Sequence, residues 1–355
     1  MFSRLILPLT YRCNLNCEYC YVDKQSGKSM SLKTALDAVD FLLKNARKNG
    51  NAANIIFVGG EPLLEWVNIV KIVRYAKRLA SGMGVSIGTI GFPTNGLLLT
   101  RDILDFCRAE HVSVAVSIDG SDNKRKTVAG GNSFPHVGEK IPLLLEYRDI
   151  VRIRSTVHPD HVEGAAERFK EFLGMGFSKI DLQPVIGIFW TPERTRAYVE
   201  QLEETLISVE RMKAITGTGV DLKHLRDFNS GQSGELGCPK IREEFLVDIG
   251  GTIYPCEFYL SFPLGQRETY AIGDIKNGVG KDVAESCLRH ILCESDDFLP
   301  IIKSKCASCT RSQACSKICL GYDQVRKRFD KKIAASNWVL FREIEKLFGA
   351  YEHLS

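Results

Sequence analysis

The sequence predicts an α/β fold in which a partial (β/α)6 barrel precedes a smaller cysteine-rich region. Up to residue 220, short apolar segments alternate with segments of helical periodicity, and such alternation is typical of a parallel sheet covered by helices. After residue 220, glycines, turns and eight of the twelve cysteines gather. We therefore expect a barrel core with a trailing helix over residues 1–220, and a second domain with a terminal helix over residues 221–355.

Six strands are predicted, each followed by a helix. The strands are Leu5–Leu9, Asn54–Val58, the run ending at Thr94, the run ending at Asp119, Val151–Val157 and Lys179–Val185. The helices are Leu32–Lys48, Leu64–Leu79, Arg101–Ala109, His136–Tyr147, Gly164–Gly174 and Pro192–Thr216. Six units rather than eight indicate an incomplete barrel. The polar and glycine motifs come where strands end, and that edge carries the chemistry of parallel α/β folds.

The remaining elements belong to the cysteine-rich part of the chain. Two strand-like segments, Phe245–Asp248 and Thr252–Tyr254, flank Gly250-Gly251, a hairpin turn signal. A last helical pattern runs over Tyr322–Glu352 and is rich in lysine and arginine, as expected for a solvated amphipathic helix.

Composition excludes several classes of protein. The 355 residues are 44% hydrophobic and 25% charged, with a net charge of +4, which is ordinary for a globular domain. The basic residues are spread along the chain, so we expect no nucleic-acid partner. No apolar run has the length of a membrane span, and no signal-peptide cleavage site is present. The cysteines therefore indicate metal ligands in a reducing cytoplasm rather than secreted disulfides.

The motif CNLNCEYC directly follows the first predicted strand. It places Cys13, Cys17 and Cys20, here called the cysteine triad, within eight residues. Thiolates at this spacing favour a soft metal. A structural zinc site needs four ligands, whereas an iron–sulfur cubane held by three thiolates keeps one iron free.

The triad and the motif Gly59-Gly60-Glu61-Pro62 after the second strand together resemble the radical S-adenosylmethionine (SAM) superfamily. Tyr19 matches the aromatic residue that usually precedes that family's third cysteine. The resemblance implies a [4Fe-4S] cluster whose free iron chelates SAM. It also implies reductive cleavage to a 5′-deoxyadenosyl radical, and an electron donor such as ferredoxin or flavodoxin.

The same resemblance assigns SAM-binding roles to residues at the strand ends. Gly59, Gly60 and Pro62 belong to a motif whose glycines let the backbone approach the ligand, and Glu61 is expected to accept the SAM ammonium group. Asn95 follows the third strand, either as part of a simple turn or as a SAM contact.

Two further residues resemble the family's partners for the SAM carboxylate. They are Ser117, at the end of the fourth strand, and Arg154, in the fifth. An arginine suits a carboxylate because its guanidinium group binds in a bidentate manner. Arg152 is the rival of Arg154, because both lie on the same face of the fifth strand.

The C-terminal cysteines resemble the SPASM extension of radical SAM enzymes, which carries two auxiliary iron–sulfur clusters. The matching pattern is Cys238-x12-Gly251-x4-Cys256, followed by Cys306-x2-Cys309-x5-Cys315-x3-Cys319. By family order, Cys238, Cys256 and Cys319 serve one cluster, and Cys306, Cys309 and Cys315 serve the other. The four-cysteine run alone is also compatible with zinc.

The chain departs from the SPASM pattern in two respects. The pattern's final cysteine is missing after Cys319, and Cys287 and Cys293 lie in the gap upstream. This pair could complete the two clusters or be free thiols, and a cluster could instead keep an open site or use Asp323.

The segment around Cys256 resembles anaerobic sulfatase maturases, which oxidise a serine or cysteine of a sulfatase to formylglycine. These enzymes carry an aspartate directly after this cysteine, proposed as a base, where the present chain has Glu257. Burial could raise the pKa of Glu257 enough for it to act as a base. A solvent-facing or salt-bridged glutamate is the alternative.

Three function hypotheses follow. The first is a radical SAM enzyme that modifies a side chain of a peptide or protein substrate. The second is an enzyme of small-molecule or cofactor biosynthesis, of the haem or quinone-cofactor type. The third is a non-catalytic metal-binding protein, which the combination of the triad with Gly59-Gly60-Glu61-Pro62 disfavours.

Overall fold

The structure, a computed structural model, describes residues 2–24, 27–120, 125–217, 219–222, 244–262, 264–280 and 331–351. The chain forms two compact units, and both combine segments that are distant in sequence. The first contains Met1–Cys13, Tyr21–Phe92 and Gln232–Arg328, and the second contains Asn14–Cys20, Pro93–Gly231 and Phe329–Ser355. The expected division of the chain at residue 220 stays a prediction.

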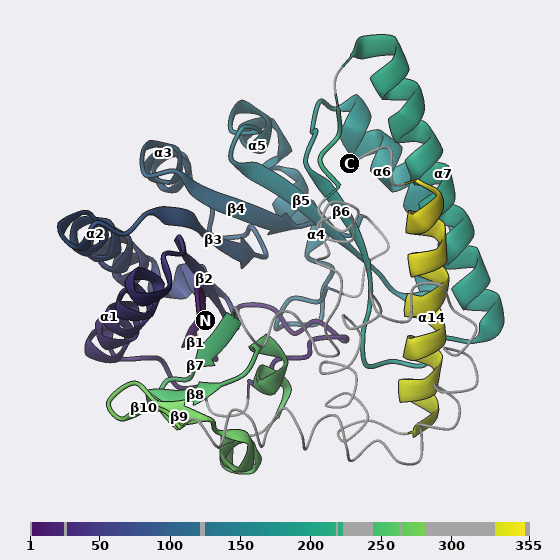
Figure 1. Cartoon of the computed structure of the whole chain (residues 1–355). Coiled ribbons are helices and arrows are strands. Elements are labelled where there is room, and N and C mark those ends of the chain that lie inside the picture. The colour runs from purple at the N-terminus through teal and green to yellow at the C-terminus, as the bar shows by residue number, and fades with distance from the viewer. Residues whose placement is uncertain are drawn as a thin grey trace. The chain divides into compact units, whose positions relative to one another are not determined.

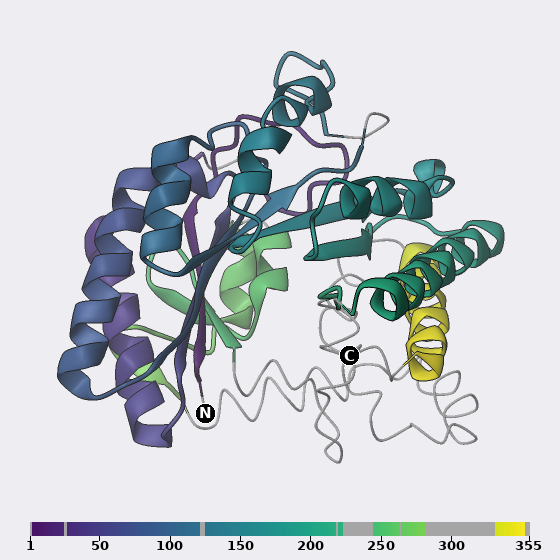
Figure 2. The ribbon, with the colours of Figure 1, turned by 90° about the horizontal axis from the view of Figure 1, so that it is seen from above.

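The first unit is built on parallel strands. β1 (Arg4–Thr10) pairs with β2 (Ala53–Gly59), and β2 pairs with β3 (Ile87–Thr94). The crossovers are α1 (Leu32–Asn49) and, after the short helix η1 (Pro62–Glu65), α2 (Trp66–Met83). Figure 2 shows α1 and α2 on one face of these strands. The apolar side chains of β1 are almost all buried, as the sequence predicts for a strand covered on both faces.

A strand from the C-terminal part of the chain completes the sheet of the first unit. β7 (Glu244–Val247) pairs with β1 in parallel and with β8 (Thr252–Tyr254) in antiparallel orientation. Short strands β9 (Gly273–Asp274) and β10 (Gly278–Val279) extend the antiparallel part. The predicted hairpin is therefore confirmed, but its first strand also belongs to the parallel sheet. Helical turns follow β8, namely η3 (Glu257–Ser261), α10 (Leu264–Arg267) and η4 (Glu268–Tyr270).

The second unit contains the parallel strands β4 (Val112–Ser117), β5 (Val151–Val157) and β6 (Ile180–Pro184). Its helices are α3 (Arg101–Ala109), α4 (Phe134–Gly138), α5 (Ile141–Glu146), η2 (Pro159–His161), α6 (Ala165–Gly174), α7 (Pro192–Thr216) and α14 (Lys331–Ala350). α14 packs beside α7 (Figure 1). Asn337 on α14 accepts a hydrogen bond from Gly187 N at 2.9 Å, which fixes this helix to the loop after β6.

One predicted helix is wrong in extent. The sequence predicts a single helix over His136–Tyr147, whereas the structure has α4 and α5 with a break at Lys140. Pro142 lies in the first turn of α5, where its missing N–H does no harm, but it would break the interior of a longer helix. The predicted C-terminal helix is described from Lys331 only, and its earlier residues lie outside the described part of the chain.

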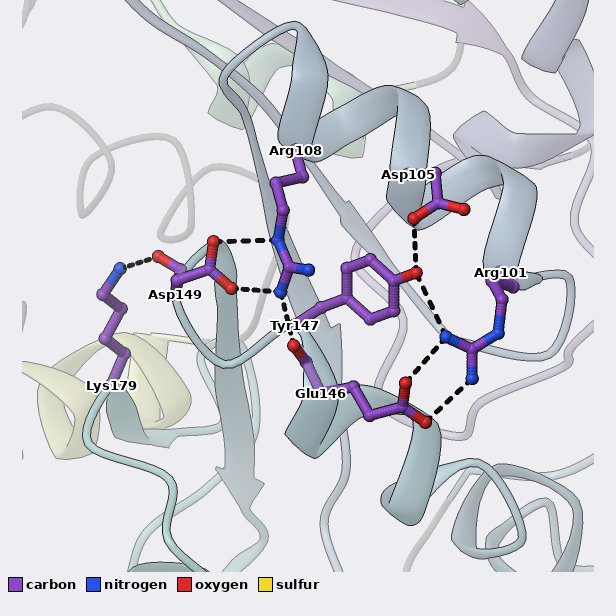
Figure 3. Close-up of polar contacts among 7 residues, drawn as sticks. All are labelled: Arg101, Asp105, Arg108, Glu146, Tyr147, Asp149 and Lys179. Atoms are coloured by element: carbon purple, nitrogen blue, oxygen red, sulfur yellow. Dashed lines mark hydrogen bonds and ion pairs between the residues drawn. The ribbon is translucent and has the colours of Figure 1, made fainter.

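A polar cluster in the second unit joins α3 to the end of α5 and to the turn before β5 (Figure 3). The ring of Tyr147 is buried, its hydroxyl donates to Asp105 at 2.5 Å, and the Arg108 guanidinium lies 4.1 Å from the ring centroid. Arg108 also pairs with Asp149, which directly precedes β5. The hydrogen bond from Arg108 lowers the pKa of Asp149. This cluster lies where β5 begins, away from the strand ends that carry the candidate site, so its role is structural.

In the described parts of the chain, no helix combines the length and the apolar character that a membrane span requires.

Candidate active site

Two glycines form the carboxyl end of β2 in the first unit. Gly60 N donates to Thr10 O at 2.8 Å. A Cβ on Gly59 would lie 2.2 Å from Thr10 O, and a Cβ on Gly60 would lie 2.0 Å from Arg12 O. Both neighbours are backbone atoms that cannot swing away, so both positions require glycine. These glycines thus hold the backbone that leads into Cys13. The expected approach of their backbone to a ligand stays a prediction.

Glu61 lies next to them and is only 1% exposed. Its Oε1 accepts a hydrogen bond from Leu63 N at 3.0 Å and caps η1, in which Pro62 is the first residue. Its own N–H donates to Arg12 O at 2.9 Å. The carboxylate is therefore held in one position at the strand end, and a carboxylate has enough lone pairs to accept an ammonium group as well.

In the second unit, hydrogen bonds attach the residues from Asn14 to Cys20 to later parts of the chain. Asn16 N donates to Lys126 O at 2.7 Å. Asn95 Nδ2 donates to Asn14 Oδ1 at 2.7 Å, while Asn95 Oδ1 accepts from Leu97 N at 3.0 Å. Asn95 is thus a turn residue that also supports the cysteine loop.

A buried polar network in the same unit surrounds Tyr19. The Tyr19 hydroxyl donates to Asp119 Oδ2, and Arg125 Nε donates to the same oxygen at 2.7 Å. Asp119 Oδ1 accepts from Thr156 N at 2.7 Å. The Arg125 guanidinium lies 5.4 Å from the centroid of the Tyr19 ring. The aromatic residue of the motif is therefore fixed by a carboxylate at the end of β4 and by a cation beside it.

The network places a positive charge near a thiol of the triad. Burial is the main cause that raises the pKa of Tyr19, so this residue stays a neutral donor to Asp119. Burial alone would lower the pKa of Arg125, but Asp119, Tyr19 and Cys17 together raise it. Arg125 is therefore charged, and a cation close to Cys17 favours the thiolate that a metal requires.

Sequence reasoning missed Asp119 and Arg125 as site residues. Asp119 had a usable signal, because it is a polar residue two positions after the end of β4. Arg125 had none, since it lies in no motif and reaches Asp119 only through the fold.

Ser117 and Arg154 lie side by side on adjacent strands, because the register of β4 and β5 pairs them directly. The Arg154 side chain is half-buried and donates one hydrogen bond, from Nη2 to Gln183 Oε1 at 2.8 Å. Its positive charge has no carboxylate within ion-pair distance in the described part of the chain. A guanidinium in this state can bind an anion.

Arg152, the rival on the same strand, is already neutralised. Its Nη1 lies 3.0 Å from Asp181 Oδ1, and its Nη2 forms a second ion pair with Asp221. Two carboxylates thus occupy this guanidinium, and the geometry favours Arg154 as the anion ligand.

The three cysteines of the triad are half-buried. Cys20 N donates to Cys17 O at 3.2 Å, which closes a tight turn between these two residues. No three histidine, cysteine or carboxylate side chains within the described residues converge as ligands of a single ion. In a cubane, each thiolate binds a different iron. The sulfur atoms of three cluster ligands therefore lie further apart than three ligand atoms of a single ion. The donor set suits a cluster held by three cysteines.

Comparison with known families indicates which kind of metal group this triad binds. Residues 7–173 match the Radical SAM superfamily. The chain carries a radical SAM domain. This domain begins in β1 and ends in α6, so it includes the cysteine triad and every predicted SAM contact.

Relatives of the radical SAM domain extend over different shares of the chain. A "Cysteine-type anaerobic sulfatase-maturating enzyme" of Clostridium novyi is 24% identical over 335 residues, which are 86% of this chain and 87% of that protein. An uncharacterized protein of Methanocaldococcus jannaschii is 40% identical over 118 residues, which are 33% of this chain and 39% of that protein.

A solved structure confirms the fold of the radical SAM chain. The structure "Native anSMEcpe with bound AdoMet and Cp18Cys peptide" is similar with a TM-score of 0.74 and 19% identity, covering 100% of this chain and 99% of that one. The predicted α/β fold is therefore confirmed, and the predicted radical SAM domain is confirmed by the family match over residues 7–173.

The region that is predicted to hold auxiliary clusters is described in part. Cys256 is buried, and Glu257 follows it as the half-buried first residue of η3. The other predicted ligands lie outside the described residues: Cys238, Cys287, Cys293, Cys306, Cys309, Cys315 and Cys319. Auxiliary clusters and the role of Glu257 as a base stay predictions.

Proposed function

We propose that this radical SAM enzyme modifies a side chain of a peptide or protein substrate. The observation that carries the proposal is the similarity to the Clostridium novyi sulfatase-maturating enzyme, which spans 86% of this chain and extends far beyond the radical SAM domain. The likeness to a fold whose solved structure contains a bound peptide supports it. A formylglycine product is one candidate, and Glu257 in place of the maturase aspartate weakens that choice.

The residue roles are proposed from the family's motifs, and the contacts within each unit support them. Cys13, Cys17 and Cys20 would hold a [4Fe-4S] cluster, which together with SAM supplies a radical able to abstract a substrate hydrogen. Glu61, fixed by Leu63 N, would accept the SAM ammonium group. Arg154 and its neighbour Ser117 would bind the SAM carboxylate.

Two auxiliary clusters complete the proposal. Cys256 and the later cysteines would hold them, in the arrangement that the SPASM pattern gives. Such clusters suit an oxidation, because they can accept the electron released when a substrate radical is oxidised. A ferredoxin or flavodoxin would deliver the first electron.

Arg154 and Arg152 form a matched pair for testing the carboxylate site. We expect Arg154→Ala to raise the KM for SAM roughly 10- to 100-fold, because a charge-assisted hydrogen bond is lost. Arg152→Ala should leave that KM near the wild-type value and lower stability, since Asp181 and Asp221 lose their cation. Steady-state kinetics of 5′-deoxyadenosine formation measures both, and equal KM values for Arg154→Ala and wild type would exclude this role.

The function is tested by anaerobic reconstitution and mass spectrometry. We expect the reduced protein to cleave SAM to 5′-deoxyadenosine and to change the mass of a peptide or sulfatase encoded beside its gene. Cys17→Ala should abolish SAM cleavage, while Cys309→Ala should retain most of it and lose the product. Absence of 5′-deoxyadenosine would overturn the mechanism. Turnover of a small molecule in place of any peptide would overturn the substrate class.

A further inference from the structure

A fully buried arginine lies in the first unit. Arg267, the last residue of α10, has 0% exposure. Its Nη1 donates to the Tyr11 hydroxyl at 2.6 Å, and its Nη2 donates to Phe262 O at 2.7 Å and to Leu260 O at 3.4 Å. The guanidinium also lies 5.5 Å from the Tyr11 ring centroid and 5.9 Å from that of Tyr254.

This arginine is unusual because its charge has no ion pair with any residue that the structure describes. Within the described residues, no carboxylate lies at ion-pair distance from Arg267, and its Nε has no hydrogen-bond partner. Buried arginines are rare and costly unless they are paired. The buried charge of Arg267 is stabilised instead by two carbonyls, one phenol and two aromatic faces. Together these groups hold the guanidinium in one position.

The contacts of Arg267 reach both ends of the loop that carries the triad. Tyr11 lies two residues before Cys13, and its N–H is held by Lys28 O at 2.8 Å. At the other end, Asp23 N donates to Leu260 O at 3.0 Å, the same carbonyl that accepts from Arg267. The hydrogen bonds of Arg267 and of Leu260 O therefore connect Tyr11, before the loop, to Asp23, after it.

We propose that Arg267 is a positioning residue that keeps the base of the cysteine loop closed. Through it, the segment that follows Cys256 sets the geometry of the site that binds SAM. The inference rests on the proposed assignment of the triad to the SAM-binding cluster. It adds that a residue far away in sequence, outside every recognised motif, controls how well the loop is formed.

Hydrogen exchange of the protein without clusters tests the closure itself. In Tyr11→Phe, which removes only the hydroxyl, and in Arg267→Lys, the Asp23 amide should exchange roughly tenfold faster than in wild type. The Gly60 amide, bonded to Thr10 O, should keep its rate. Arg108→Lys is the matched control, because Arg108 also stacks on a tyrosine but lies on the surface of the second unit.

Kinetics and spectroscopy of the reconstituted protein separate positioning from bulk stability. Tyr11→Phe should raise the KM for SAM roughly tenfold with little change in kcat. It should also alter the electron paramagnetic resonance spectrum of the reduced cluster with SAM bound. Tyr11→Phe decides the question if Arg267→Lys fails to fold.

Two results would overturn the proposal. One is an unchanged Asp23 exchange rate in Tyr11→Phe. The other is faster exchange with an unchanged KM and spectrum, which would make Arg267 merely structural. Failure of the triad assignment is distinguished separately, because Cys17→Ala would then retain SAM cleavage whatever the exchange data show.

Discussion

Gly60→Ala is expected to eliminate SAM cleavage. The new methyl carbon would lie 2.0 Å from Arg12 O and 2.5 Å from Arg12 C, and both atoms belong to the backbone. Arg12 and the adjoining Cys13 must therefore move by an amount that no side-chain rotation can absorb. The φ angle of Gly60 is not in the left-handed region, so the requirement is one of space rather than of conformation.

The measurement is 5′-deoxyadenosine formation together with iron content after anaerobic reconstitution. Gly82→Ala is the matched control, because Gly82 lies in α2 with no atom within 4 Å of the position its Cβ would take. We expect this control to keep full activity and to gain about 0.5–1 kcal/mol from better helix propensity. Wild-type cleavage by Gly60→Ala would show that the strand end does not position Cys13.

Asp119→Asn is expected to lower the free energy of unfolding by about 3–5 kcal/mol, the usual cost of breaking a buried ion pair on one side. The amide can still accept from Thr156 N, but its NH2 group would face two donors, the Tyr19 hydroxyl and Arg125 Nε. Arg125 would also lose its counter-charge while remaining largely buried. Chemical denaturation of the protein without clusters measures the change.

The control for this variant is Asp105→Asn. Asp105 also accepts from a tyrosine hydroxyl, that of Tyr147, but it is exposed, so the expected loss is about 1 kcal/mol or less. The double variant Asp119→Asn/Arg125→Met should recover part of the lost free energy of unfolding, because it also removes the cation of the broken ion pair. Equal losses at Asp119 and Asp105 would contradict a buried ion pair.

Local sequence patterns predicted the elements of the barrel well. The helices Arg101–Ala109 and Pro192–Thr216 and the strand Val151–Val157 have the predicted bounds. In each case apolar periodicity agrees with a cap or with a β-branched run, so short-range signals were sufficient. The single helix expected over His136–Tyr147 failed because the proline in its middle was given too little weight.

The contacts that complete the candidate site could not be predicted in this way. The sequence predicted the triad, Glu61 and Arg154 through the family's motifs, and it kept Arg152 as the rival of Arg154. The choice between the two arginines depends on Asp181 and Asp221, which reach Arg152 only in the folded chain. Arg125 and Arg267 likewise contact tyrosines that are distant in sequence, Tyr19 and Tyr11, and nothing local marks them.

The parallel pairing of β7 with β1 has a consequence for synthesis on the ribosome. β1 emerges first, yet one of its two neighbours is β7, and the Phe245 ring packs 5.0 Å from that of Phe2 and 5.4 Å from that of Phe41. Until residues 244–247 have left the exit tunnel, the nascent chain presents an apolar sheet edge open to other strands. The growing polypeptide is therefore exposed to aggregation for most of its translation, and this interval is where a holdase chaperone would act.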